Sequence, residues 1–151
     1  MAWTEYPYSN VWHGEQDFVI KQPRIEIDIF KGNKSFHQSA IVDSGSDLIL
    51  LSADIAPVLG INLLGCKSMS VRGITGSRVD GYLCEIGVRV EKFEEIVHVL
   101  AVFVEDLHTN MLLGQHGFFR HFRIKFEQDR NMFALERAPR NIVNDPIAFE
   151  E

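Results

Sequence analysis

Residues 40–51 place an acidic turn between two short apolar runs, and no other stretch constrains the fold as much. Ala40 to Val42 predicts a buried strand, and Leu48 to Leu51 predicts a second one. Between them lie Asp43, Ser44 and Gly45, and the glycine is expected to supply backbone angles that other residues resist. Because a carboxylate costs much free energy to desolvate, we interpret Asp43 as catalytic. An ordinary Asx-turn is the alternative, since Asp, Ser and Gly are common turn residues.

The size of the chain predicts one globular domain. It has 151 residues, of which 46% are hydrophobic and 24% charged, enough for a core of its own. Residues 1–20 are aromatic and polar without a clear period, so we expect an amino-terminal extension that packs on the domain or on a partner. The domain is predicted over residues 21–137, and a loose polar tail over residues 138–151.

The charge of the chain argues against two classes of partner. A formal net charge of −6 offers no basic surface for nucleic acid or acidic membrane, so we expect neither. The longest apolar stretch, Ile96 to Val104, is interrupted by His98 and is about half the ~20 residues of a membrane helix. The first residues lack the basic start and apolar core of a signal peptide. We therefore expect a soluble, cytoplasmic protein.

The cysteines and histidines indicate no metal or disulfide chemistry. Cys66 and Cys84 form no Cys-x-x-Cys pair and are too few for a disulfide framework, so we expect both to be reduced. The six histidines lack the spacing that sets two imidazoles on one helix face. We expect no metal and no cofactor. Nothing favours a Cys/His nucleophile pair, although such partners meet only in space.

Most of the remaining chain has the patterns of β-strands. From Pro23 onward, Ile25, Ile27 and Ile29 alternate with charged residues, which predicts a half-buried strand. Further elements are expected in this order: a turn at 31–34, a short helical turn at 54–60, a hairpin over 69–83 bent at 73–76, strands at 86–90 and 96–104, a short strand at 111–114, a short helix at 115–122 and a hairpin over 124–135. The sequence thus predicts an all-β fold.

Three of these elements together resemble a known family. They are the Asp43 triplet, the glycine-bounded bend over 73–76, and Leu112, Leu113 and Gly114 before the short helix. Their order and spacing over residues 20–137 resemble the retropepsin-like aspartic proteases, including small bacterial members. The resemblance implies a closed or partly open β-barrel with one or two short helices, and it implies hydrolysis of peptide bonds.

The resemblance also implies roles for particular residues. By position it implies a catalytic triplet (Asp43, Ser44, Gly45), a flap tip (Gly73, Ile74, Thr75, Gly76), an apolar support for the catalytic loop (Leu112, Leu113, Gly114) and further substrate contacts (Asp47, Leu48). Hydrolysis by this route needs two carboxylates that share one proton. Because the chain has one such triplet, we expect a homodimer that brings two copies of Asp43 to a peptide or protein substrate.

Two departures from the family pattern affect this expectation. Retroviral members usually follow the last glycine with an arginine that pairs with the second aspartate of the catalytic loop, whereas this chain has Gln115. Asp47 must then find another partner or be solvated. The termini also differ, so the terminal dimer sheet of the viral enzymes cannot be assumed.

The sequence leaves three other functions as alternatives. A non-catalytic module of the same fold would dimerise or bind peptide in the same groove. A β-barrel that binds small molecules would explain the strands but would leave the Asp43 loop without a purpose. A serine hydrolase at Ser44 or Ser46 is disfavoured, because neither serine lies in a Gly-x-Ser-x-Gly elbow.

Overall fold

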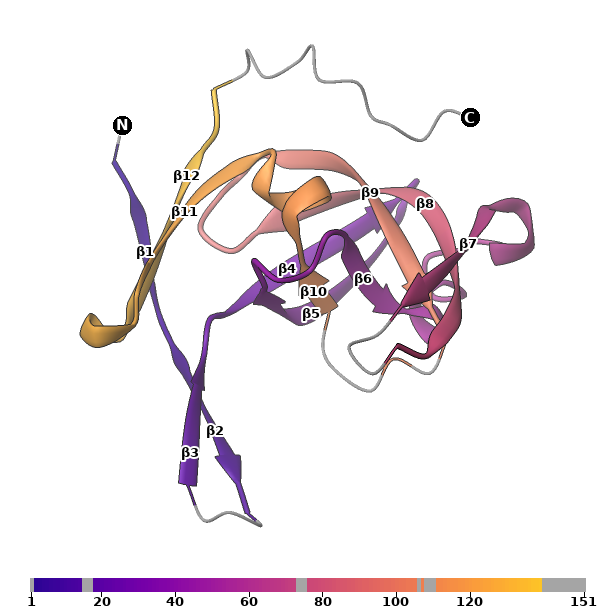
Figure 1. The fold of residues 1–151 in the computed structure, drawn as a ribbon. Helices are drawn as coiled ribbons and strands as arrows, with labels where there is room; N and C mark the ends of the chain where they lie inside the picture. Colours follow the sequence, from indigo (N-terminus) through magenta and orange to yellow (C-terminus); the bar gives the residue numbers. More distant parts are fainter. Residues whose placement is uncertain (1, 15–17, 73–75, 106, 108–110, 140–151) are drawn as a thin grey trace.

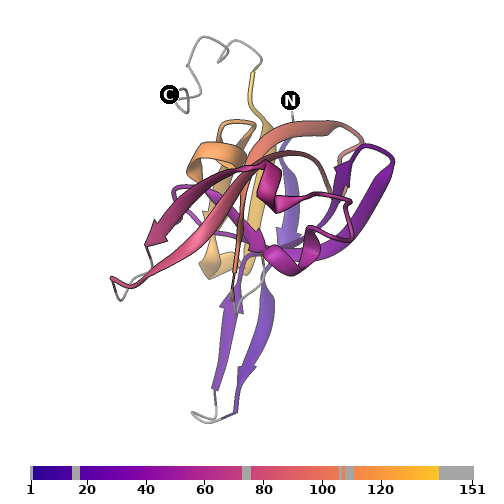
Figure 2. The same cartoon turned by 90° about the vertical axis from the view of Figure 1, so that its right-hand side faces the viewer.

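The computed structural model of the chain is built almost entirely from β-strands (Figures 1 and 2). It describes residues 2–14, 18–72, 76–105, 107 and 111–139. The strands are β1 (Thr4–Pro7), β2 (Ser9–His13), β3 (Phe18–Gln22), β4 (Arg24–Lys31), β5 (Lys34–Val42), β6 (Ile49–Ser52), β7 (Lys67–Arg72), β8 (Arg78–Val90), β9 (Ile96–Val104), β10 (Met111–Leu113), β11 (Phe122–Glu127) and β12 (Met132–Arg137). The helical elements among the described residues are η1 (Ala53–Ile55), η2 (Leu63–Gly65), η3 (Gln115–Phe119) and η4 (Gln128–Arg130), each of five residues or fewer.

The main sheet closes on itself. Its strand order is β4-β5-β10-β6-β9-β8-β7, and β4 also pairs with β8. That last pairing joins β4, β5, β10, β6, β9 and β8 into a ring, with β7 attached outside it. The predicted all-β, barrel-like fold is confirmed, and closure leaves β7 as an edge strand of the sheet.

Strand β4 shows why the alternation in the sequence predicts the fold correctly. Ile25, Ile27 and Ile29 point into the barrel and are at most 1% exposed. The charged residues between them face outward, as the two-residue period of a strand requires. Gly32 then turns the chain at a φ of +59°, a conformation that glycine adopts without steric cost.

Strand β8 is one long element where the sequence predicts two. It runs through Cys84 and Glu85, which pair with Ala101 and Leu100 of β9, so the ladder continues without a break. A Cβ on Gly81 would lie 2.6 Å from Cγ1 of Val102, so the glycine makes room for its neighbour. The outer part of β8 pairs with β7 and the inner part with β4, and the predicted hairpin over 69–83 is confirmed by the β7–β8 pairing.

The expectation of reduced cysteines is wrong. Cys66, just before β7, forms a disulfide with Cys84 of β8, at a Cα–Cα distance of 5.9 Å. The two residues face each other because the antiparallel register that pairs Lys67 with Leu83 brings their neighbours together. Disulfides persist mainly in oxidising compartments, so this bond and the predicted cytoplasmic location point in different directions.

The amino-terminal residues form strands although their sequence has no clear period. Strand β1 pairs antiparallel with β12 and completes a three-stranded sheet with β11. Tyr6 is 2% exposed, stacks on Phe133 with ring centroids 5.3 Å apart, and donates its hydroxyl to the carbonyl of Glu91. This strand therefore packs on the domain. Strands β2 and β3 pair with each other and with no other strand in the described ranges. Within the described ranges, no helix has the length and apolar character that crossing a bilayer requires.

Candidate active site

The Asp43 loop connects β5 to β6, and its path is determined by β10. Strand β10 lies between these two strands, parallel to β5 and antiparallel to β6. The loop that joins them must therefore pass over the end of β10. The backbone N–H of Asp43 donates to the carbonyl of Leu113 at 3.0 Å, which fixes the start of the loop on this strand.

The residues after β10 hold the rest of the loop. The backbone N–H groups of Gln115 and His116 donate to the carbonyls of Ser46 (2.9 Å) and Asp47 (2.8 Å). Gly114 makes this approach feasible, because a Cβ there would lie 2.3 Å from the carbonyl oxygen of Leu48 and 2.4 Å from that of Ser46. No side chain fits in that space.

The side chain of Asp43 is half-buried and oriented by its own loop. Its Oδ1 accepts a hydrogen bond from the backbone N–H of Gly45 at 2.9 Å. Among the described residues, no group donates to Oδ2, so one carboxylate oxygen is left for a ligand. The expectation that Gly45 needs unusual backbone angles is wrong, because its φ is not positive. Its small size matters instead, since a Cβ would lie 3.3 Å from Oδ1 of Asp43.

Gln115 has a structural role that the sequence alone does not indicate. Its Nε2 donates to the carbonyl of Ser44 at 2.9 Å, which ties the exposed tip of the loop to the segment after β10. The glutamine therefore braces the same loop that an arginine is expected to brace, but through a neutral hydrogen bond. Asp47 is exposed and makes no ion pair with any described residue, so its carboxylate is solvated.

A cavity of about 430 Å³ lies between the Asp43 loop and the β7–β8 hairpin. Its lining residues from the barrel side are Asp43, Gly45, Ser46, Asp47, Leu48, Leu50 and Leu112, and those from β7 are Met69, Ser70, Val71 and Arg72. Asp43, Gly45, Asp47, Leu48 and Leu112 were predicted from the sequence for this site, whereas Ser46, Leu50 and the β7 residues were not. The β7 residues could have been found from their position in the hairpin.

The predicted flap tip falls mostly outside the described residues. Gly73, Ile74 and Thr75 are not described, so their predicted roles stay predictions. Gly76 has a φ of +86°, which is left-handed and favours glycine. Neither Leu113, which is fully buried, nor Ser44, which is exposed, is among the residues that line the cavity.

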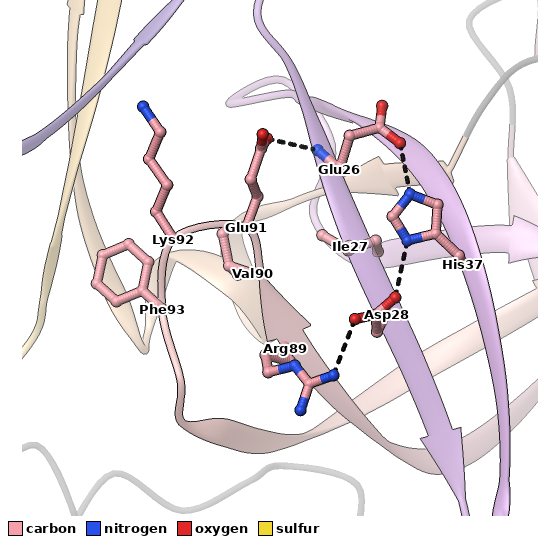
Figure 3. A pocket seen from close by; sticks show the side chains of 9 residues that line it. All are labelled: Glu26, Ile27, Asp28, His37, Arg89, Val90, Glu91, Lys92 and Phe93. Atoms are coloured by element: carbon pink, nitrogen blue, oxygen red, sulfur yellow. Dashed lines mark hydrogen bonds and ion pairs between the residues drawn. The ribbon is translucent and has the colours of Figure 1, made fainter.

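A second cavity, of about 380 Å³, lies on the outside of the barrel where β4 meets β5 and β8 (Figure 3). We call Glu26, Asp28, His37 and Arg89 the seam cluster. Asp28 and Arg89 pair across the β4–β8 seam that closes the barrel, and His37 lies opposite Asp28 on β5. Nε2 of His37 contacts Glu26 at 2.8 Å, and Nδ1 contacts Asp28 at 2.7 Å. The other oxygen of Asp28 accepts from Arg89 at 3.0 Å.

The seam cluster satisfies its own hydrogen bonds. Hydrogen bonds to Asp28 and then Glu26 raise the pKa of His37, and the bond from His37 is the main cause that lowers the pKa of Asp28. Both ring nitrogens of His37 are occupied by carboxylates, so the ring has none left for a ligand. No group of metal-ligating side chains occurs in the part of the chain that the structure describes. The Asp43 cavity is therefore the better candidate site.

Comparison with known proteins identifies the fold. No protein-family model matches the chain, and no curated protein is similar to it in sequence. A retropepsin-like aspartic protease from Rickettsia conorii is similar in structure, with a TM-score of 0.53 and 19% identity over 74% of this chain and 88% of that chain. The retroviral protease-like domain of Ddi1 from Leishmania major has a TM-score of 0.54 and 16% identity, over 81% of this chain and 98% of that chain. The chain has a retropepsin-like fold.

The retropepsin-like fold confirms the fold predicted from three short sequence elements. The two similar structures share too little sequence identity with this chain to indicate its activity. Function therefore depends on the chemistry of the site. The site offers one oriented carboxylate in a partly apolar cavity, beside an edge strand that is tied to the barrel by a disulfide.

Proposed function

We propose that this protein is a homodimeric aspartic endopeptidase that takes one Asp43 from each of two copies. The observation that carries the proposal is the position of Asp43, which is oriented by Gly45 at one side of the cavity and has Oδ2 uncommitted among the described residues. A purely structural Asx-turn would not need the carboxylate to line a cavity of this size.

The chemistry requires the second copy. Two carboxylates close together cannot both ionise cheaply, so the pair keeps one proton. The ionised member takes a proton from the attacking water, and the protonated member donates to the scissile carbonyl. The hydroxyl of Ser44 has no partner among the described residues of its own chain and is exposed, so it is available to a second loop across a two-fold axis.

The cavity suits an extended peptide. Strand β7 forms one wall and is an edge strand of the sheet, so its outer backbone groups can pair with an added strand. Leu48, Leu50, Met69 and Val71 give the cavity apolar surface for alternate substrate side chains. Asp47 and Arg72 are exposed and line the same cavity, so their charged groups can contact polar groups of the substrate.

The proposal is tested by proteolysis of an unfolded protein mixture between roughly pH 4 and 7, where a shared-proton pair is singly protonated. The wild type is expected to cleave, and Asp43→Asn is expected to lower the rate by about 10²-fold to 10⁴-fold, the usual contribution of a catalytic acid or base. Asp54→Asn is the matched control, because Asp54 is exposed and does not line the cavity. Both variants should unfold at the wild-type denaturant concentration.

Two results would contradict the peptidase. One is a wild type that cuts nothing at any pH in that range, and the other is an Asp43→Asn variant that cuts as well as the wild type. A wild type that binds peptide without cutting it would instead support the non-catalytic module.

A further inference from the structure

The β2–β3 hairpin projects from the body of the molecule, and we call it the arm. It comprises Ser9–His13 and Phe18–Gln22, which pair with each other and with no other described strand. In both views its far end extends beyond the rest of the drawn chain (Figures 1 and 2). Among the described residues, the arm is joined to the body near its base, where the N–H of Tyr8 donates to the carbonyl of Asn131 and Lys21 donates to the Asn131 side chain at 2.9 Å.

Apolar side chains are concentrated on the arm. Of the seven large hydrophobic side chains that are exposed among the described residues, three lie here: Trp12 (60% exposed), Phe18 (46%) and Val19 (49%). Trp12 and Val19 are directly opposite each other across the two strands, so they form one apolar patch. A lone two-stranded hairpin is marginally stable in water, and an exposed apolar patch on it indicates a surface that another molecule covers.

The arm leaves the barrel at the edge that carries Asp43. Its second strand leads through Pro23 into β4, and the carbonyl of Pro23 accepts a hydrogen bond from the N–H of Val42 at 2.9 Å. Val42 directly precedes Asp43. The base of the arm is therefore beside the loop that, in the proposed function, a second copy must approach.

We propose that the arm binds a second copy of this chain and helps to hold the two Asp43 loops together. The inference rests on the proposed dimeric site. Each arm strand has five residues, so the arm reaches about 16 Å from a base that lies beside the Asp43 loop. The symmetry makes the contact reciprocal, with two arms and two receiving surfaces for each dimer.

A partner copy explains why the arm has this composition. An exposed tryptophan is typical of the residues that contribute most to association. The arm also supplies a dimer contact to a chain whose Gln115 replaces the expected charged brace at the loop. Gln115 donates to the carbonyl of Ser44 in its own loop, so the arm would add to the contact that Ser44 offers to a second copy.

The first test measures the mass in solution of the full chain by sedimentation over a wide concentration range. The double variant Trp12→Ser, Val19→Ser is expected to raise the dimer dissociation constant by roughly tenfold or more. Leu64→Ser is the matched control, because Leu64 is 89% exposed but lies in η2, away from the arm. Far-ultraviolet circular dichroism verifies that all three proteins remain folded.

A second test reports the contact at the arm itself. The chain has two tryptophans, so Trp3→Phe leaves Trp12 as the sole tryptophan, which is excited selectively at wavelengths where tyrosine does not absorb. Quenching of this variant by acrylamide is expected to fall as the protein concentration rises through the dissociation constant. The same loss of quenching is not expected when Val19→Ser is added to weaken the dimer.

The outcomes separate this inference from the peptidase. A wild-type dimer that is unaffected by Trp12→Ser, Val19→Ser, with Trp12 equally quenched in monomer and dimer, would overturn the role of the arm and leave the peptidase intact. A dimer that depends on the arm but cleaves nothing would support the arm and refute the peptidase. A chain that is monomeric at every concentration would overturn both.

Discussion

The Asp43 loop and the seam cluster are both polar, but they are held in opposite ways. The loop is fixed by backbone hydrogen bonds to Leu113, Gln115 and His116, and by neutral side-chain bonds from Gln115 and Ser46. The seam cluster is held by charged side chains that contact each other across three strands (Figure 3).

The difference shows what each region can be used for. Backbone donors do not titrate and are little affected by salt, so the loop can keep one geometry while its carboxylate remains available for a substrate. The charged side chains of the seam cluster pair with one another, and His37 is more than one-third exposed. The stability of the cluster is therefore expected to depend on pH and salt. A catalytic carboxylate is better held by backbone hydrogen bonds than by charged side chains.

The largest expected effect tests the close approach that the loop depends on. Gly114→Ala would place a Cβ against the carbonyl oxygens of Leu48 and Ser46, and it should lower the free energy of unfolding by about 3 kcal/mol. Urea denaturation measures this change. Gly65→Ala is the control, since a Cβ there meets nothing within 4 Å, and its effect should stay within about 0.5 kcal/mol. Equal stability of the two variants would show that the loop is not fixed by this contact.

A smaller effect is expected from the neutral brace. Gln115→Ala removes the hydrogen bond to the carbonyl of Ser44, and the loss should be about 1 kcal/mol. On the proposed function, kcat/KM should fall by roughly fivefold, and the fall should be the same at low and high salt because no charge is involved. Gln128→Ala, at an exposed glutamine of η4, should change neither quantity. A salt-dependent loss at Gln115 would remove the contrast between the two regions.

The smallest effect concerns the pH dependence of the seam cluster. The pKa of His37 is raised, so its contribution is complete below the ordinary value of about 6.5 and is lost as the pH rises through the raised value. The pKa of Asp28 is lowered, so its contribution is present above about 3.9 and is lost as the pH falls through the lowered value.

Wild type should therefore lose stability relative to His37→Gln between roughly pH 6 and 8, by less than about 1 kcal/mol because the pair is exposed. Melting temperatures of both proteins across this range measure the difference. His121, whose pKa is lowered mainly by burial, is present in both and cancels. A difference that stays constant with pH would mean that His37 does not titrate in this range.

Features that depend on local pattern could be predicted from the sequence. The isoleucines of β4 alternate over a few residues, and Asp43, the hairpin and Leu112 to Gly114 follow one another in an order that the structure brings to one cavity and its support. Each of these signals lies within a short window, so no knowledge of distant partners is needed.

Features that depend on pairing across the chain could not be predicted. The disulfide follows from the β7–β8 register, the burial of Tyr6 from the pairing of β1 with β12, and the role of Gln115 from a loop that lies 71 residues earlier. Cys66 and Cys84 carry no spacing signal of their own. For Gly45 the residue was singled out but the reason was wrong, because its φ is not positive and the structure shows only a tight 3.3 Å approach of a Cβ to Oδ1 of Asp43.

Reduction of the bond between Cys66 and Cys84 is a way to alter the cavity wall formed by β7. It links the start of β7 to β8 just before the Lys67–Leu83 pair. The disulfide therefore fixes this end of the hairpin and leaves the end near Arg72 and Arg78 without a covalent link. Protein stored with a thiol reductant would thus lack the covalent link at the start of β7, and protein stored without one would keep it. Rates recorded on one preparation would not describe the other.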